Sequence, residues 1–160
     1  MDVHTAGTDR VEDLTDCWVA LAREQRQYDS HLRADANRAS IRESMVRHAV
    51  ADRALVAVED GDVLGFVTFD VETGHYEQDV ERGIVEHLFV VPDRREEGIG
   101  TRLLSAAETA LADRGVDVVA LDAMADNEAA RRFYRRHGYE PHRVTIEKSI
   151  ESDTHSKENT

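Results

Sequence analysis

An arginine and two glycines stand between an apolar run and a helical pattern. The run Glu86–Val91 is rich in β-forming residues and Pro92 ends it; Arg95-x-x-Gly98-x-Gly100 then opens a segment with helical spacing. The first N–H groups of a helix lack intrahelical acceptors and carry partial positive charge, and glycines let a ligand approach the backbone. The pattern predicts a site for an anion such as a pyrophosphate. The alternative is a turn whose glycines serve geometry alone.

Two other nucleotide-binding loops do not fit this chain. A Rossmann fingerprint needs a third glycine and an acidic residue about twenty positions further on, after the first strand, and that strand lacks the pattern. A phosphate loop of the Walker type needs Gly-Lys-Ser/Thr, which is absent after the glycines.

A second chemically suggestive segment runs from Asn127 to Tyr139. Asn127 and Tyr134 lie seven residues apart, which places them on one face of a helix two turns apart. The plain alternative is that Tyr134 is a core aromatic paired with Phe133. The four arginines of this segment, Arg131, Arg132, Arg135 and Arg136, are typical of a solvated helix face.

Charge and composition limit the classes of partner. The chain has 160 residues, 33 acidic against 20 basic, and a net charge of −13; only Lys148 and Lys157 are lysines. This acidic surface argues against nucleic acid, and the scarcity of lysine resembles proteins of extremely halophilic organisms. With no long apolar run and no secretory signal, we expect no membrane partner and a cytoplasmic location. The single thiol, Cys17 beside Trp18, is expected to be an inert core residue.

The elements that must position these residues follow from hydrophobic spacing. The order predicts a mixed α/β sheet with helices packed on it, as a domain over residues 1–150 followed by a polar tail over 151–160. Asp60-Gly61 predicts a hairpin turn. The predicted helices are Val11–Leu32, Ala39–Ala51, Ile99–Arg114 and Asn127–His137, and the predicted strands are Ala54–Val58, Val63–Phe69, Ile84–Val91, Val116–Leu121 and Val144–Ile150.

The two segments together resemble motifs A and B of the GNAT superfamily of N-acetyltransferases. Motif A is Arg/Gln-x-x-Gly-x-Gly/Ala, and motif B is Asn-x-x-Ala-x-x-Phe-Tyr-x-x-x-Gly-Phe/Tyr, here Asn127 to Tyr139. The resemblance covers about Ala54 to Ile150. It implies a GNAT fold, with a mostly antiparallel twisted sheet, a splayed central strand pair and about four flanking helices. It also implies acetyl-CoA as cosubstrate, an amine acceptor and no metal, and it is compatible with a homodimer.

The resemblance further implies which residues hold the cosubstrate. Leu88 and Val90 would pair with the pantetheine through their main chains. Glu96 and Glu97 stand where the family usually has Gly and Lys/Arg, so their carboxylates are expected to point to solvent. The pyrophosphate would lie on the loop and first helical turn, namely Arg95, Glu96, Glu97, Gly98, Ile99, Gly100 and Thr101. Asn127 would bond the cofactor, and Tyr134 would protonate the departing thiolate.

The resemblance also implies a proton acceptor and an acceptor pocket. An alkyl amine has a pKa of about 10.4, so it arrives protonated, and Glu86 is the predicted base. An ion pair between Glu86 and an arginine is the alternative role, and His87, expected on the opposite face of the strand, is the alternative base. Tyr28, His31 and Tyr76 are candidate acceptor contacts. A non-catalytic acyl-CoA-binding module of the same fold is the alternative function.

Overall fold

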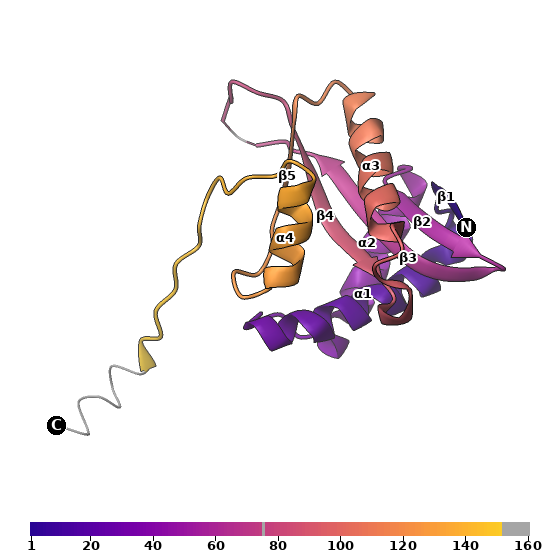
Figure 1. Cartoon of the computed structure of the whole chain (residues 1–160), viewed down its shortest axis with the longest axis horizontal. Helices are drawn as coiled ribbons and strands as arrows, with labels where there is room; N and C mark the ends of the chain where they lie inside the picture. Colours follow the sequence, from indigo (N-terminus) through magenta and orange to yellow (C-terminus); the bar gives the residue numbers. More distant parts are fainter. Residues whose placement is uncertain (75, 152–160) are drawn as a thin grey trace. The chain divides into compact units, whose positions relative to one another are not determined.

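The computed structural model describes residues 1–74 and 76–151 (Figure 1). The chain divides into two units, Met1–Glu128 and Ala129–Thr160, which are described separately below. Apart from Glu151, the predicted polar tail 151–160 lies outside the described residues. None of the helices in the described ranges combines the length and the apolar character that a membrane crossing requires.

Two N-terminal helices form one layer of the first unit. Helix α1 spans Val11–Gln25 and α2 spans Arg38–Val50. Helix α1 ends earlier than the predicted Leu32, because a 3-10 turn at Arg26–Tyr28 leads into Asp29, which has a left-handed φ of 69°. Leu14, Trp18 and Ala22 recur at helical spacing and are buried in one cluster with Met45 and Ala49 of α2, as the periodicity predicts.

The sheet has five strands in the order β1-β2-β3-β4-β5, all antiparallel except the parallel β4–β5 pair. A turn at Asp60-Gly61 joins β2 to β3 with positive φ values of 51° and 84°, which confirms the predicted hairpin. The short edge strand β1 has no strong sequence signal and was not expected. The strands are β1 Asp2–Thr5, β2 Ala54–Glu59, β3 Asp62–Val71, β4 Arg82–Val90 and β5 Val118–Leu121.

Strand β4 is irregular on both of its edges, near the same residue. Against β3, Thr68 pairs with His87 and Phe69 pairs with Val85, so Glu86 is the extra residue of a β-bulge. Against β5, pairing stops at Val85↔Leu121 although β4 continues to Val90. The central strands therefore separate after Val85, which is the splayed pair that the fold class implies.

Helix α3, Ile99–Ala112, covers the face of the sheet opposite α1 and α2 (Figure 1). Leu103, Leu104 and Leu111 are buried on its inner face. Gly65 of β3 is required at this layer, because a Cβ there would lie 2.4 Å from the Phe89 carbonyl oxygen and 3.2 Å from Leu103. The sheet is therefore held between two helical layers, with α1 and α2 on one face and α3 on the other.

The second unit carries α4, Glu128–Arg136, which agrees with the predicted helix within a residue. The predicted strand Val144–Ile150 is wrong: residues 140–149 have no regular structure. Its apolar side chains are 76 % exposed at Val144, 89 % at Ile146 and 78 % at Ile150. The alternation is typical of a strand, but a strand also needs a partner for its backbone groups, and alternation alone does not supply one.

Candidate active site

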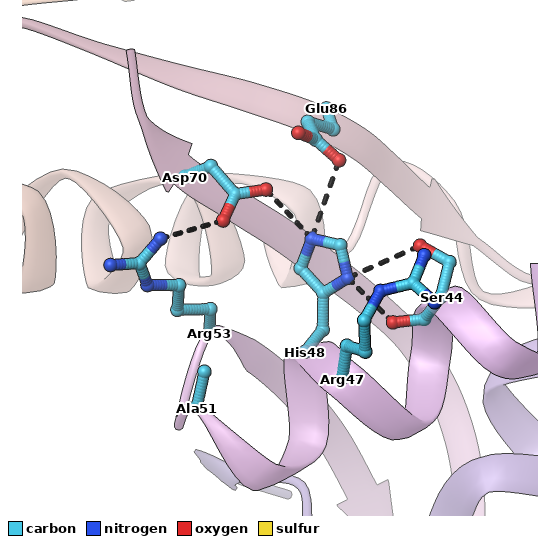
Figure 2. Close-up of a pocket in the computed structure, with 7 residues that line it drawn as sticks. All are labelled: Ser44, Arg47, His48, Ala51, Arg53, Asp70 and Glu86. Atoms are coloured by element: carbon cyan, nitrogen blue, oxygen red, sulfur yellow. Dashed lines mark hydrogen bonds and ion pairs between the residues drawn. The ribbon is translucent and has the colours of Figure 1, made fainter. Parts of the chain in front are cut away.

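Glu86 lies in a pocket built from α2 and two strands (Figure 2). The pocket has a volume of about 390 Å³ and is lined by Ser44, Arg47, His48, Ala51, Arg53, Asp70 and Glu86. Glu86 is not at the buried strand position that the sequence suggested, since 34 % of its side-chain surface is exposed. Its ion partner is a histidine, His48, and not an arginine. The bulge explains the orientation, because it turns the extra residue of β4 towards α2.

His48 is the centre of this pocket and is 8 % exposed. Its Nε2 lies 2.9 Å from Asp70 Oδ2 and 3.3 Å from Glu86 Oε2, while its Nδ1 lies 2.8 Å from the Ser44 carbonyl oxygen. The hydrogen bond with Glu86 is the largest cause that raises the pKa of His48 to about 9, and those with the Ser44 carbonyl and Asp70 outweigh the opposing effect of burial. His48 therefore carries a positive charge at neutral pH.

Asp70 is held from two sides. Arg53 Nη1 donates to its Oδ1 at 2.8 Å, and His48 occupies its Oδ2. Burial opposes ionisation of this half-buried carboxyl, but its hydrogen bonds with Arg53 and His48 keep its pKa below the ordinary value. Asp70 therefore stays ionised and helps to fix the imidazolium.

His87 does not face away from Glu86 as expected. Its ring lies against Trp18 of α1, with ring centroids 6.3 Å apart, and against Phe66, at 6.4 Å. Because of the bulge, the successive residues Glu86 and His87 both point to the layer formed by α1 and α2. Burial, more than the nearby charge of His48, lowers the pKa of His87 to about 4, so His87 is neutral and packs as an aromatic ring.

The glycine loop leads from β4 into α3 as the sequence predicts. Gly98 is the N-cap residue of α3 with a left-handed φ of 86°, and its carbonyl accepts the Arg102 N–H at 3.1 Å. Gly100 lies in the first turn of this helix. Glu96 also has a left-handed φ, 67°, and is exposed, which explains why a glycine suits this position.

The charges of the loop are mostly engaged with one another. Glu97 accepts from Arg94 Nε at 3.0 Å, so its carboxylate is paired and does not simply point to solvent. Arg95 donates to the Val90 carbonyl at 2.8 Å and pairs with Glu24 of α1, also at 2.8 Å. The Arg95 side chain thus braces the loop against α1.

Leu88 and Val90 present main-chain groups on the open edge of β4. The Val91 N–H donates to the Leu64 carbonyl of β3, and in an antiparallel ladder alternate residues point to the partner strand. The main-chain groups of Leu88 and Val90 therefore point away from β3, to the side where β5 has separated. The Val90 carbonyl holds Arg95 there.

The second unit contains Tyr134, whose ring contacts Phe133 at 5.3 Å and Tyr139 at 5.9 Å between centroids. Burial raises its pKa to about 12, so the phenol keeps its proton at neutral pH. In the first unit, Asn127 directly precedes α4, and its N–H donates to the Met124 carbonyl at 3.0 Å. The aromatic packing that the sequence offered as an alternative is present at Tyr134.

The candidate acceptor contacts lie on two loops. Tyr28 closes the 3-10 turn after α1 and is half-buried, and His31 follows it in an exposed position. Tyr76, between β3 and β4, is 88 % exposed. They are separate from the residues that line the pocket at Glu86.

Sequence reasoning missed His48 and Asp70. A buried histidine near the end of an amphipathic helix and an aspartate near the end of a strand each have ordinary explanations. The signal that was available is weak: Asp70 ends the β-rich run that follows the Asp-Gly hairpin, and His48 is three residues after the buried Met45. The register of β3 on β4 brings Asp70 near Glu86, and the packing of α2 on the sheet brings His48 to both.

Solved structures share this fold. A GCN5-related N-acetyltransferase from Ralstonia eutropha matches with a TM-score of 0.74 and 25 % identity, covering 93 % of this chain and 97 % of that one. The aminoglycoside N-acetyltransferase AAC(6')-Iy, solved with a CoA-containing bisubstrate analogue, matches with a TM-score of 0.68 and 18 % identity, covering 92 % and 97 %.

Sequence comparison then gives the family. Residues 11–139 match the profile of the Acetyltransferase (GNAT) family, and the chain belongs to that family. Mycothiol acetyltransferases from Clavibacter michiganensis and Clavibacter sepedonicus are each 34 % identical over 138 residues, or 84 % of this chain. The chain spans 42 % of the length of these two relatives.

Proposed function

We propose that this protein transfers the acetyl group of acetyl-CoA to a primary amine by direct attack within a ternary complex. The observation that carries the proposal is the open edge of β4, which runs from Glu86 at the bulge to the glycine-opened start of α3. It places a carboxylate, main-chain groups that point away from β3 and, after the loop, a helix N-terminus in that order along the chain. Membership of the GNAT family supports the same order of roles.

The open edge of β4 and the start of α3 suit two parts of acetyl-CoA, the pantetheine and the pyrophosphate. The main-chain groups of Leu88 and Val90 would pair with the amides of the pantetheine as an added strand does. The N–H groups at the start of α3 would hold the pyrophosphate, with Gly98 supplying the left-handed turn that brings the backbone close. Asn127 would add a hydrogen bond to the cosubstrate.

Glu86 would remove the proton of the incoming amine. Once that proton has passed to solvent, the neutral amine nitrogen attacks the thioester carbonyl carbon and the new C–N bond forms. The nitrogen then loses its second proton to Glu86, and the C–S bond breaks to release the thiolate. The N–H of Val90, which points away from β3, would polarise the carbonyl as charge develops on its oxygen. Glu86 is suited to this role because its carboxylate is partly exposed in the pocket while His48 fixes one of its oxygens.

Tyr134 would assist the leaving group. With a pKa of about 12 the phenol is protonated at neutral pH, so it has a hydrogen to donate. A thiol has a pKa of about 8.5, so complete proton transfer from the phenol to the thiolate is unfavourable. We therefore assign Tyr134 a hydrogen bond to the departing sulfur, with the proton coming finally from solvent.

The test is release of free CoA from acetyl-CoA over a panel of primary amines, comparing wild type with Glu86→Gln. We expect kcat/KM of the variant to fall by about 10²- to 10⁴-fold near neutral pH, because the proton acceptor is lost. The deficit should shrink as rising pH deprotonates the free amine. Glu43→Gln, at an exposed position of α2, is the matched control and should leave the rate unchanged.

Two results would contradict the proposal in different ways. Equal activity of Glu86→Gln and wild type at every pH would remove Glu86 as the base. Binding of acetyl-CoA without release of CoA over the whole panel would instead favour a non-catalytic acyl-CoA-binding module.

A further inference from the structure

A buried positive charge lies directly behind the carboxylate proposed as the base. Both ring nitrogens of His48 lie closest to acceptors: Nδ1 faces the Ser44 carbonyl at 2.8 Å, with the Ser44 hydroxyl further away at 3.4 Å, and Nε2 faces Asp70 at 2.9 Å and Glu86 at 3.3 Å (Figure 2). A neutral imidazole has only one N–H, so one of its nitrogens would be left without a proton against an acceptor oxygen. A doubly protonated ring would donate to an acceptor from each of its nitrogens.

The two carboxylates depend on this charge. Within the described residues, one carboxylate oxygen of Asp70, one of Glu86 and a ring nitrogen of His48 all lie within 4.8 Å of one another. Two carboxylates at such a distance disfavour each other's ionised form, and one of them takes up a proton unless a cation lies between them. His48 occupies that place.

The other charged groups around the ring do not replace it. Arg53 is engaged with the far oxygen of Asp70, at 2.8 Å, and Arg47 is an exposed residue of α2 that lines the same pocket. His87, the next residue of β4, is neutral because burial lowers its pKa to about 4. His48 contacts both Asp70 and Glu86.

We propose that His48 is a positioning residue which, as an imidazolium anchored on the Ser44 carbonyl and Asp70, keeps the Glu86 carboxylate ionised and directs it into the pocket. This inference rests on the proposed role of Glu86 as base. It makes His48, Asp70 and Glu86 a single unit assembled from α2, β3 and β4. The acceptor amine then meets a carboxylate with one oxygen already fixed.

A divalent cation is the competing occupant of this place. A histidine that donates Nδ1–H to a backbone carbonyl and turns Nε2 to two carboxylates also has the form of a metal ligand set. The two occupants exclude each other, because a metal requires the unprotonated nitrogen. The favoured occupant is the proton, since the Nε2 hydrogen already satisfies both carboxylates without any further ligand.

The first measurement is direct and needs no activity. The ¹⁵N chemical shifts of the His48 ring in the metal-free, full-length wild type at pH near 7 should be those of an imidazolium, with both nitrogens protonated. The same spectrum is then recorded with one equivalent of Zn²⁺. A neutral ring in the metal-free protein would overturn the proposal. So would a shift of the Nε2 resonance to the metal-bound position at equimolar Zn²⁺.

The second measurement is the pH profile of kcat/KM for His48→Gln and for His48→Gln/Asp70→Asn. Glutamine retains a hydrogen-bond donor but not the charge, so relative to wild type the single variant should lose about tenfold or more near pH 6 and little near pH 8.5. Removing the second carboxylate should restore the acid limb in the double variant. A loss that is equal at every pH, or that the second change does not repair, would overturn the proposal.

The proposed function fails in a distinguishable way. If Glu86→Gln has wild-type activity at all pH values, Glu86 is not the base, whereas the ring spectrum still reports the charge of His48. If His48→Gln does not fold, the spectrum of the wild type alone decides.

Discussion

Glu96 is an acidic residue in a conformation that glycine adopts freely. Its φ of 67° lies in the left-handed region, next to the glycine that caps α3. A non-glycine residue there costs about 1 kcal/mol, and its carboxylate lies on the loop proposed to hold a pyrophosphate. The charge at this position therefore acts against tight binding of an anion, and the backbone conformation costs stability.

We expect Glu96→Gly to bind acetyl-CoA about two- to fivefold more tightly at low salt, because one repulsive charge is removed. Stability should change little, since relief of strain offsets the greater backbone entropy of glycine in the unfolded chain. Calorimetric titration at low and high KCl measures the effect, which should shrink as salt screens the charge. Glu96→Gln should give the same gain in affinity. An affinity unaffected by either change would place the pyrophosphate elsewhere.

Single residues were predictable where a local pattern marks them. Glu86 was identified because it lies on the strand that runs into the glycine loop, and Gly98 because its spacing marks the start of a helix. The role of His48 was not predicted. Its partners Asp70 and Glu86 lie 22 and 38 residues away in sequence and meet it only in the folded chain. The orientation of His87 was wrong for the same reason: a bulge changes the alternation of a strand and leaves no mark in the sequence.

At the scale of elements, α2 and β4 each contribute a histidine with a shifted pKa. The pKa of His48 on α2 is raised, and the pKa of His87 on β4 is lowered. The pKa of His48 is raised from 6.5 to about 9, so its contribution to stability is complete below 6.5 and is lost as the pH rises through 9. The pKa of His87 is lowered from 6.5 to about 4, so the unfolded chain binds a proton first and stability falls as the pH drops from 6.5 to 4.

We therefore expect the melting temperature to be highest near pH 6.5 and to decline on both sides at constant ionic strength. His48→Gln should flatten the alkaline decline, and His87→Phe should flatten part of the acid decline. The acid side retains a slope from Asp70, whose lowered pKa makes its ionised form stabilising. An alkaline decline unchanged by His48→Gln would show that His48 is not protonated in the folded protein.

Elements with their own periodicity were predicted closely, as in α3, whose bounds Ile99–Ala112 lie within the predicted Ile99–Arg114. The early end of α1 depends on Asp29, a residue type that tolerates the left-handed region but does not require it. The absent strand at Val144–Ile150 shows what alternation of apolar and polar residues cannot predict. Alternation indicates that a segment is compatible with a strand, but it does not indicate whether a neighbouring strand is available for pairing.

At the scale of the whole molecule, the net charge of −13 is the dominant feature. Much of it is self-repulsive at low ionic strength, so the compact state should gain stability when salt is added. We expect the free energy of unfolding, measured with urea in KCl from about 0.1 M to about 3 M, to rise steeply at first and to level near 1 M, where the Debye length is about 3 Å. A flat response would contradict the interpretation that the composition is adapted to salt.

The shape of that curve separates two causes. Screening saturates once the charges no longer interact, whereas exclusion of solute from the protein surface continues to grow with concentration. Betaine at matched concentrations is the uncharged control and should not reproduce the early rise.

The gap between β4 and β5 also bears on how the protein avoids self-association. A strand with free N–H and C=O groups at the margin of a sheet is a template for cross-chain pairing and fibre growth. Here the free groups after Val85 form only a short open edge, because β5 is still joined to β4 at its other end. Under the proposed function the pantetheine would lie along this edge and cover it, so the bound cosubstrate would also protect the sheet from cross-chain pairing.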